Sequence, residues 1–385
     1  MDGNTLASRK SPRPEGMTTP RSAKPYRRIA VLGMGSWGTA LASVAATTGC
    51  AVRLWGRRDA LAKAINTERR NVDYLPDAPL PEGIEATTDL AYALADAEAV
   101  LLVTPSRTLR KMCGQIRAHL PKNVPLVLGC KGIEQGTGYL LSALVEEELP
   151  GHPVGALSGP TFAKETVLGH PSAATIAFEF SYKDRLAPQD SPAARMSVTM
   201  SSAAFRPYIS DDLTGVEIGG AVKNVIAIAC GMMTGAGFAE NTRAALIARG
   251  MDEMKFLAEA LGGRRETVTG LSGAGDLTLT CSSLTSRNMS LGHQLGQGIP
   301  RDQCFDGKKV VVEGEVNAIS VVDLARRIGV TMPISEAVHA ILHEGADLSS
   351  TFVELWSRPI ESEPRALSIE LDHPASRPAS RKERT

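Results

Sequence analysis

Short apolar runs alternate with helix-like stretches of small residues over the first half of the chain. The runs are rich in β-branched and aliphatic residues and lie at 28–33, 51–55, 99–103, 125–129, 154–157 and 173–177. This alternation is typical of a doubly wound parallel sheet covered by helices on both faces. The pattern therefore predicts an α/β domain in this half of the chain.

After about Tyr208 the apolar positions follow the 3.6-residue period of helices. The predicted helices span 212–234, 242–261, 286–296, 312–328 and 334–343, and glycine-rich or polar turns join them. We expect a sheet domain at 28–209 followed by an all-α domain at 210–357. The polar segment 181–195, which contains two prolines, is predicted to be a surface loop. We expect the basic segment 1–27 and the polar segment 358–385 to be disordered tails.

Composition and charge exclude several classes of protein. The chain has 42 basic and 42 acidic residues and 4% aromatics, whereas a nucleic-acid binder needs a basic excess and stacking rings. No stretch has the roughly 18 uncharged apolar residues that a membrane span requires. The six cysteines are scattered without a C-x-x-C pair, which indicates reduced thiols in a cytoplasmic protein. His339 and His343 lie four residues apart on a predicted helix, but they match no metal motif, and we expect no metal site.

The first apolar run leads directly into Gly33-Met-Gly35-Ser-Trp-Gly38, and a helix of small residues follows. In this context Gly33 permits a tight turn, Gly35 lets a pyrophosphate approach the backbone, and Gly38 lets the helix pack on the strand. The helix N-terminus would supply amide donors to the anion. The motif predicts a dinucleotide site in a Rossmann-type domain, the alternative being a glycine turn without a ligand.

Two arginines follow the second apolar run, where an enzyme selective for NAD usually has an acidic residue. Guanidinium groups suit a 2′-phosphate, so Arg57 and Arg58 favour NADP(H) over NAD(H). The alternative is that both are ordinary solvated charges, and the neighbouring Asp59 leaves NAD(H) open.

Seven motifs occur in an order that resembles the bacterial-type NAD(P)-dependent glycerol-3-phosphate dehydrogenase family. They are GMGSWGTALA (33–42), VTPS (103–106), CKGIE (130–134), LSGPTFAKE (157–165), GGAVKNVIAIACG (219–231), LSGAGDLTLTCSSLTSRN (271–288) and VVEGE (311–315). The resemblance covers about residues 28–344. It implies reversible hydride transfer between NAD(P)H and dihydroxyacetone phosphate, which gives sn-glycerol 3-phosphate for glycerophospholipid synthesis. A homodimer is one candidate assembly. Two alternatives stay open: a related dehydrogenase acting on a hydroxy acid or sugar acid, and a nucleotide sensor without turnover.

Lys223 is the predicted catalytic residue. A lysine on a helix of small residues would be a buried cation, and burial beside other cations lowers a lysine pKa until it can act as a general base. The resemblance implies that Lys223 is the proton acceptor, whereas an ion pair with Glu217 or Asp276 would give it a structural role. Gly219 and Gly220 are expected to leave room for a ring or substrate against this helix.

The resemblance also implies the other site residues. Ser286, Arg287 and Asn288 combine a hydroxyl, a guanidinium and an amide, a set suited to a phosphate dianion. Asp276 would contact substrate, the alternative being an ordinary helix cap. The expected substrate contacts are Lys131, Gly159, Thr161, Lys223, Asp276, Ser286, Arg287 and Asn288. The expected cofactor contacts are Gly33, Gly35, Ser36, Trp37, Gly38, Arg57, Arg58, Lys131, Ala163, Arg287, Val311 and Glu313.

Overall fold

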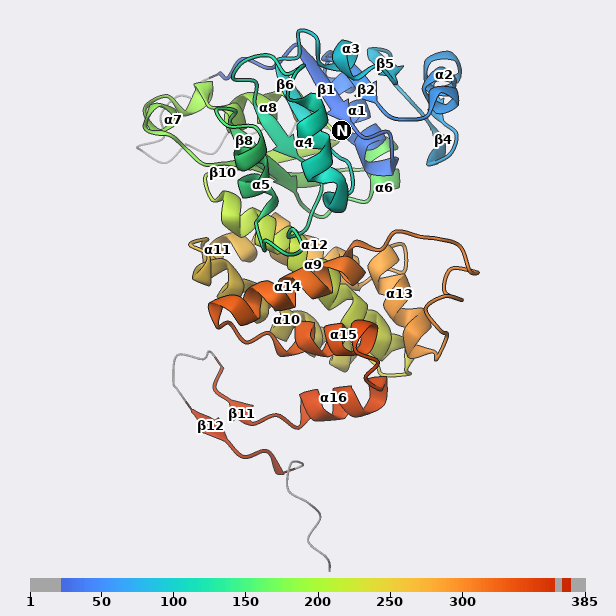
Figure 1. Ribbon diagram of the computed structural model, residues 1–385, viewed down its shortest axis with the longest axis vertical. Helices are drawn as coiled ribbons and strands as arrows, with labels where there is room; N and C mark the ends of the chain where they lie inside the picture. Colours follow the sequence, from blue (N-terminus) through green and yellow to red (C-terminus); the bar gives the residue numbers. More distant parts are fainter. Residues whose placement is uncertain (1–21, 364–368, 375–385) are drawn as a thin grey trace, which may run out of the picture.

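The structure is a computed structural model that describes residues 22–363 and 369–374. A sheet domain and a helical domain lie one above the other, and a short C-terminal hairpin extends beyond the helices (Figure 1). The sheet has eight strands in the order β10-β9-β8-β7-β6-β1-β2-β5. Their bounds are β1 Arg28–Leu32, β2 Ala51–Trp55, β5 Ile84–Thr87, β6 Ala99–Leu102, β7 Leu126–Leu128, β8 Val154–Ser158, β9 Ser172–Phe178 and β10 Phe205–Ser210.

The sheet is mixed rather than wholly parallel as expected. The strands from β8 to β5 are parallel to one another, but β9 runs antiparallel to β8, and β10 is parallel to β9. The link from β8 to β9 contains only the five-residue helix α6 (Ala163–Val167). A helix this short rises about 7.5 Å and does not run the length of a strand, as the helix of a parallel crossover does.

Both faces of the sheet are buried, which explains why its strands are nearly continuous apolar runs. In β1, Ile29 and Val31 belong to the core on one face, whereas Ala30 and Leu32 belong to the core on the other. The first core is closed by α1 (Ser36–Thr47), α2 (Asp59–Glu68) and α8 (Pro192–Met200). The second is closed by α3 (Leu90–Leu94), α4 (Leu109–Ile116) and α5 (Leu141–Glu148), together with the first turn of α9 (Leu213–Gly235).

The helical domain is built around α9. Its main neighbours are α10 (Glu240–Ala260), α12 (Asp276–Cys281), α13 (Arg287–Gly296), α14 (Glu313–Ile328) and α15 (Pro333–His343). Helices α9 and α13 approach so closely that a Cβ on Gly231 or Gly292 would overlap a carbonyl oxygen of the other helix. By length and composition α9 could cross a membrane, but its whole apolar window is buried, as in the core helix of a soluble protein.

The other described elements are small. They are the strand pair β3 (Arg70–Asn71) and β4 (Leu75–Pro79), helices α7 (Tyr182–Leu186), α11 (Arg265–Val268) and α16 (Leu348–Trp356), the 3₁₀ turns at Ser106–Thr108 and Pro188–Asp190, and the π-helical turn η3 (Leu271–Gly275). The six predicted runs correspond to β1, β2, β6, β7, β8 and β9, and the five predicted helices agree with α9, α10, α13, α14 and α15 within one or two residues at each end.

Three predicted irregular segments have structure. Tyr26, within the expected N-terminal tail, is buried, and its amide donates to Thr199 Oγ1 at 2.7 Å. The expected loop 181–195 contains α7 and the start of α8, and Ser181 with Asp184 forms a capping box. In the expected C-terminal tail, β11 (Ile360–Glu361) pairs antiparallel with β12 (Glu370–Leu371). Residues 1–21, 364–368 and 375–385 of the two expected tails lie outside the described residues.

Candidate active site

The glycine loop joins β1 to α1 at the carboxyl end of the sheet, where β1 lies between β6 and β2. Gly33 has φ +133°, and a Cβ there would lie 2.6 Å from the Val103 carbonyl oxygen. A Cβ on Gly38 would overlap the Gly33 carbonyl oxygen, whereas one on Gly35 would meet nothing within 4 Å. No side chain caps α1 and its first turn, which includes Ser36 and Trp37, has no acidic residue. The loop therefore offers open backbone and unpaired first-turn amides, a good fit for the pyrophosphate of a dinucleotide.

The two arginines after β2 have different surroundings. Arg58 forms an ion pair with Asp73 in which a guanidinium nitrogen lies 2.6 Å from a carboxylate oxygen, and its guanidinium lies 5.2 Å from the centre of the Tyr74 ring. Arg57 is exposed and has no hydrogen bond or ion pair to any residue in 22–363 or 369–374. The Arg57 guanidinium is therefore unengaged, whereas Arg58 shares its charge with Asp73 in an exposed ion pair.

Four side chains from three separate segments meet between the two domains. Asp276, at the start of α12, accepts a hydrogen bond from Lys223 Nζ of α9 at 2.7 Å. Its second carboxylate oxygen accepts from Lys131 Nζ, in the loop after β7, at 2.5 Å. Lys223 also donates to Thr280 Oγ1 at 2.9 Å, and Thr280 donates to Asp276 at 3.2 Å. Lys223 is 7% exposed and Asp276 is 2% exposed, so this network is almost entirely removed from bulk water.

Burial and the neighbouring charges set the protonation of this network. Burial lowers the pKa of Lys223, the Lys131 charge lowers it further, and Asp276 partly opposes both. Burial alone would raise the pKa of Asp276, but the two lysine charges outweigh it and hold that pKa below its usual range. Lys223 is therefore a cation that gives up its proton more readily than a free lysine, beside a carboxylate that stays ionised.

The surroundings of Lys223 correct two expectations. Of the two ion-pair partners named for Lys223, Asp276 does pair with it, whereas Glu217 accepts from the amide and hydroxyl of Ser142. A Cβ on Gly219 would lie 2.8 Å from the Ser272 carbonyl oxygen, and one on Gly220 would lie 3.3 Å from the Lys131 side chain. The room beside these glycines is therefore filled by the protein's own loop and lysine stem.

The triplet Ser286-Arg287-Asn288 lies at the N-terminus of α13, but its members differ in their contacts. The Ser286 hydroxyl caps the helix. Asn288 donates to Asn224 Oδ1 at 2.8 Å and accepts from the Gly314 amide at 2.9 Å, which ties α13 to α9 and α14. Arg287 is exposed and has no hydrogen bond or ion pair within the part of the chain that the structure describes. Asn224 Nδ2 is buried and has no hydrogen-bond partner among those residues, so it is a donor left over for a ligand.

The remaining predicted positions border this region. Gly159 and Thr161 lie in the turn between β8 and α6, and Pro160 of that turn approaches the space beside Gly275, just before Asp276. Ala163 begins α6, which packs against α1. Val311 is exposed just before α14, and Glu313 is the first residue of that helix.

Sequence reasoning did not identify two residues of this region, Thr280 and Asn224, and it named Glu217 as a possible partner of Lys223 rather than of Ser142. Thr280 lies four residues after Asp276 on one helix, so it could have been found by spacing, whereas Asn224 contacts Asn288, 64 residues away, and has no such signal. No local signal identifies Glu217, because its partner lies 75 residues earlier in the chain.

Comparison with known proteins agrees with this geometry. Residues 28–183 match the family model described as NAD-dependent glycerol-3-phosphate dehydrogenase N-terminus, and residues 212–353 match the model of its C-terminus. A glycerol-3-phosphate dehydrogenase [NAD(P)+] from Rhodospirillum rubrum is 45% identical over 335 residues, which is 87% of this chain and 93% of that protein. One from Parvibaculum lavamentivorans is 45% identical over 88% of this chain and 98% of that protein.

A solved structure extends the similarity to three dimensions. The crystal structure of glycerol-3-phosphate dehydrogenase from Coxiella burnetii superposes with a TM-score of 0.79 at 36% identity and covers 86% of this chain and 99% of that chain. The two domain matches, their order along the chain and the full-length relatives therefore all point to the same family. This chain is an oxidoreductase that belongs to the NAD(P)-dependent glycerol-3-phosphate dehydrogenase family.

Proposed function

We propose that Lys223 is the general base and acid of this dehydrogenase. It would accept the proton of the C2 hydroxyl of sn-glycerol 3-phosphate during oxidation and return it to the carbonyl oxygen of dihydroxyacetone phosphate during reduction. The observation that carries this proposal is the buried network in which Lys223 Nζ lies 2.7 Å from Asp276, whose other oxygen binds Lys131. The nicotinamide, when bound, accepts or supplies the hydride at C2.

Asp276 and Lys131 have distinct parts in this proposal. Asp276 orients the Lys223 ammonium and stays ionised, because both lysines lower its pKa. The Lys131 charge lowers the pKa of Lys223 and places a second cation where negative charge develops on the substrate oxygen. Pro160, between Gly159 and Thr161, lies beside Gly275, the residue before Asp276, and this turn would close the substrate site from the sheet side.

The substrate phosphate would bind at the N-termini of α13 and α14. Their second residues, Asn288 and Gly314, are joined by a hydrogen bond, so the positive ends of both helix dipoles lie together. Arg287 supplies a free guanidinium and Asn224 a buried, unpartnered amide donor. The Asn288 oxygen already accepts from Gly314, so only its second amide hydrogen is left for the substrate. Ser286 would contribute its hydroxyl.

The cofactor would lie along the carboxyl end of the sheet. The pyrophosphate fits over Gly33, Gly35 and Gly38 and the amides of Ser36 and Trp37. We propose that NADP(H) is preferred, because the free Arg57 guanidinium would bind the 2′-phosphate while Arg58 is held by Asp73. The remaining contacts of the cofactor would come from Ala163, Val311, Glu313, Lys131 and Arg287.

In this arrangement, residues 28–209 bind the cofactor and residues 210–357 supply the base and the phosphate site. The enzyme would work in the cytoplasm and reduce dihydroxyacetone phosphate for glycerophospholipid synthesis.

The test is a panel of initial rates with the full-length chain. NADPH and NADH oxidation are followed by absorbance with dihydroxyacetone phosphate, and with a 2-keto acid that has no phosphate. We expect turnover only with the phosphorylated ketone, competitive inhibition by inorganic phosphate, and a lower KM for NADPH than for NADH. Equal turnover of the unphosphorylated keto acid would refute the phosphate site, and a lower KM for NADH would refute the NADP(H) preference.

A further inference from the structure

Helix α5 of the sheet domain is capped by a residue of the helical domain. The residue at its own N-cap position is Leu140, which has no side-chain hydrogen bond to offer. Instead, Glu217 of α9 accepts from the Ser142 amide at 2.9 Å and from the Ser142 hydroxyl at 2.5 Å. A carboxylate at a helix N-terminus satisfies free amides and interacts favourably with the helix dipole. Glu217 therefore completes the first turn of a helix from which it is 75 residues distant in sequence.

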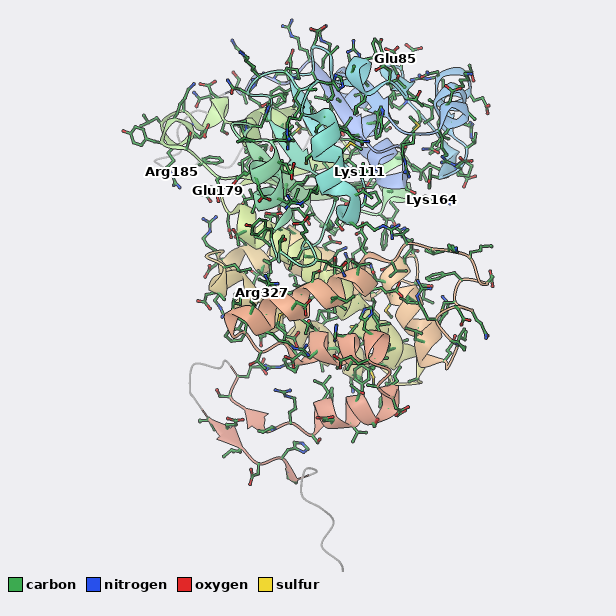
Figure 2. All side chains as sticks on the ribbon, viewed as in Figure 1. Glu85, Lys111, Lys164, Glu179, Arg185 and Arg327 are labelled. Carbon is green, nitrogen blue, oxygen red and sulfur yellow. The ribbon has the colours of Figure 1, made fainter. Side chains whose placement is uncertain are left out.

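The loop that precedes α5 carries Lys131. This loop, residues 129–140, leaves β7 at the carboxyl end of the sheet. The helical domain contacts it at two places and holds the chain at a third place just beyond the loop. Near its start, Lys131 binds Asp276 at 2.5 Å. In its middle, Arg327 of α14, labelled in Figure 2, donates to the carbonyl oxygens of Thr137 at 2.5 Å and Gly136 at 3.3 Å. Just beyond its end, Glu217 binds Ser142.

Glu217 and Lys223 lie on the same helix, six residues or about 9 Å of helix rise apart. Because every residue of α9 from Gly215 to Met233 is buried, the helix is a stiff link between these two residues. We propose that Glu217 is a positioning residue, which by capping α5 fixes loop 129–140 on α9 and so holds the Lys131 ammonium against Asp276 and Lys223. The inference rests on the proposed role of Lys223 as the proton-transferring group.

The chain contains a matched control for this inference. Glu253 of α10 is also buried, and it accepts from the Ile334 amide at 2.5 Å and from the Ser335 amide and hydroxyl at 3.2 and 2.9 Å. It caps α15 just as Glu217 caps α5, and burial raises the pKa of each carboxyl to about 7. However, every one of these Glu253 contacts lies within the helical domain. The two glutamates share their local chemistry and differ in whether they hold the loop of Lys131.

The experiment compares Glu217→Ala with Glu253→Ala in the full-length enzyme. Four quantities are measured: the Tm, kcat/KM for dihydroxyacetone phosphate, the Kd of NADPH, and the pH profile of kcat/KM for glycerol 3-phosphate oxidation. We expect Glu217→Ala to lower kcat/KM by about 10- to 100-fold, the scale of an ångström-sized misplacement of a catalytic group, with the Kd of NADPH within about twofold. The two variants should lower the Tm by similar amounts, but Glu253→Ala should leave kcat/KM within about twofold of the wild type.

The pH profile distinguishes positioning from a general loss of structure. The charged or titratable groups that face Lys223 are Asp276, Lys131, Glu313 and the Cys281 thiol. Of these, Lys131 lowers the pKa of Lys223. If Glu217→Ala lets Lys131 move away, the pKa that controls oxidation rises, whereas Glu253→Ala leaves it in place.

A conservative variant and a second partner keep the test decisive. Glu217→Gln can still accept from the Ser142 amide and donate to its hydroxyl, so it should recover most of the lost kcat/KM. If Glu217→Ala does not fold, Ser142→Ala removes the hydroxyl contact alone and should raise the same pKa. Unchanged kinetics and pH profile in these variants, or equal changes in Glu217→Ala and Glu253→Ala, would overturn the inference. Full activity in Lys223→Met would instead refute the proposed role of Lys223.

Discussion

Replacing Lys223 by methionine separates the chemistry of this residue from its contribution to folding. Methionine keeps a flexible apolar stem of similar length in a site where lysine is 7% exposed. The variant loses the hydrogen bonds to Asp276 at 2.7 Å and Thr280 at 2.9 Å. Asp276 nevertheless keeps Lys131 at 2.5 Å and the Thr280 hydroxyl at 3.2 Å, so no buried charge is left alone.

The size of the effect follows from these contacts. A hydrogen bond between charged groups contributes about 1.5–3 kcal/mol to stability, and burying an ammonium costs several kcal/mol, so the two terms largely offset each other. We expect the free energy of unfolding of Lys223→Met, measured with urea, to stay within about 2 kcal/mol of the wild type. The rate of dihydroxyacetone phosphate reduction should fall by about 10²–10⁴-fold, the usual contribution of general acid–base catalysis.

Asp276→Asn is the contrasting change. It leaves the buried Lys223 and the partly buried Lys131 without their shared counter-charge, and an uncompensated buried charge typically costs about 3–5 kcal/mol. It also removes the charge that raises the pKa of Lys223, so that pKa falls further. Because the neutral lysine then exists at lower pH, the acid limb of glycerol 3-phosphate oxidation should move to lower pH. The reasoning fails if Lys223→Met is destabilised more than Asp276→Asn, or if Lys223→Met reduces dihydroxyacetone phosphate at the wild-type rate.

Three further predictions concern other parts of the chain. Arg57→Ala should raise the KM for NADPH by about 10- to 100-fold and leave that for NADH unchanged, while Arg58→Ala has a smaller effect because Asp73 already binds its guanidinium. Burial raises the pKa of Glu253 to about 7, so its folded form keeps a proton that the unfolded chain loses above about pH 4.3, and stability falls as pH rises between these values. Urea titrations at several pH values give the slope of the unfolding free energy against pH, and Glu253→Gln should make that slope less negative by up to about 1.4 kcal/mol per pH unit. An unchanged slope would contradict the raised pKa of Glu253. Tyr26→Ala should lower the free energy of unfolding by about 3 kcal/mol or more, and no change would show that this residue is not part of the core.

Periodicity and local motifs predicted the parts of this protein that depend on neighbouring residues. The helix around Lys223 and the strand before Gly33 are buried on nearly all sides, so most of their residues are apolar or small. The glycine loop was predictable because the reasons for glycine at Gly33 and Gly38 lie within one strand–turn–helix unit and the adjacent strand.

Contacts between distant segments were not predictable in the same way. The sequence before α5 gives no sign that Glu217 caps this helix. Likewise, the residues next to Arg57 and Arg58 do not show which of the two arginines pairs with Asp73. Composition was misleading over 181–195, where polar residues and prolines suggested a loop. Local signals were present there, because Ser181 with Asp184 has the spacing of a capping box and Pro192 follows the N-cap Ser191.

Complete burial of α9 has a consequence for the dynamics of the catalytic apparatus. Amide groups exchange with solvent only when their hydrogen bonds open, and a helix enclosed on all sides opens only when the surrounding structure does. The amides around Lys223 should therefore be among the slowest in the protein to exchange deuterium, at rates close to those of global unfolding. Any motion that admits substrate or releases product must then come from the loops and helix ends around this helix, while Lys223, the proposed base, stays in place.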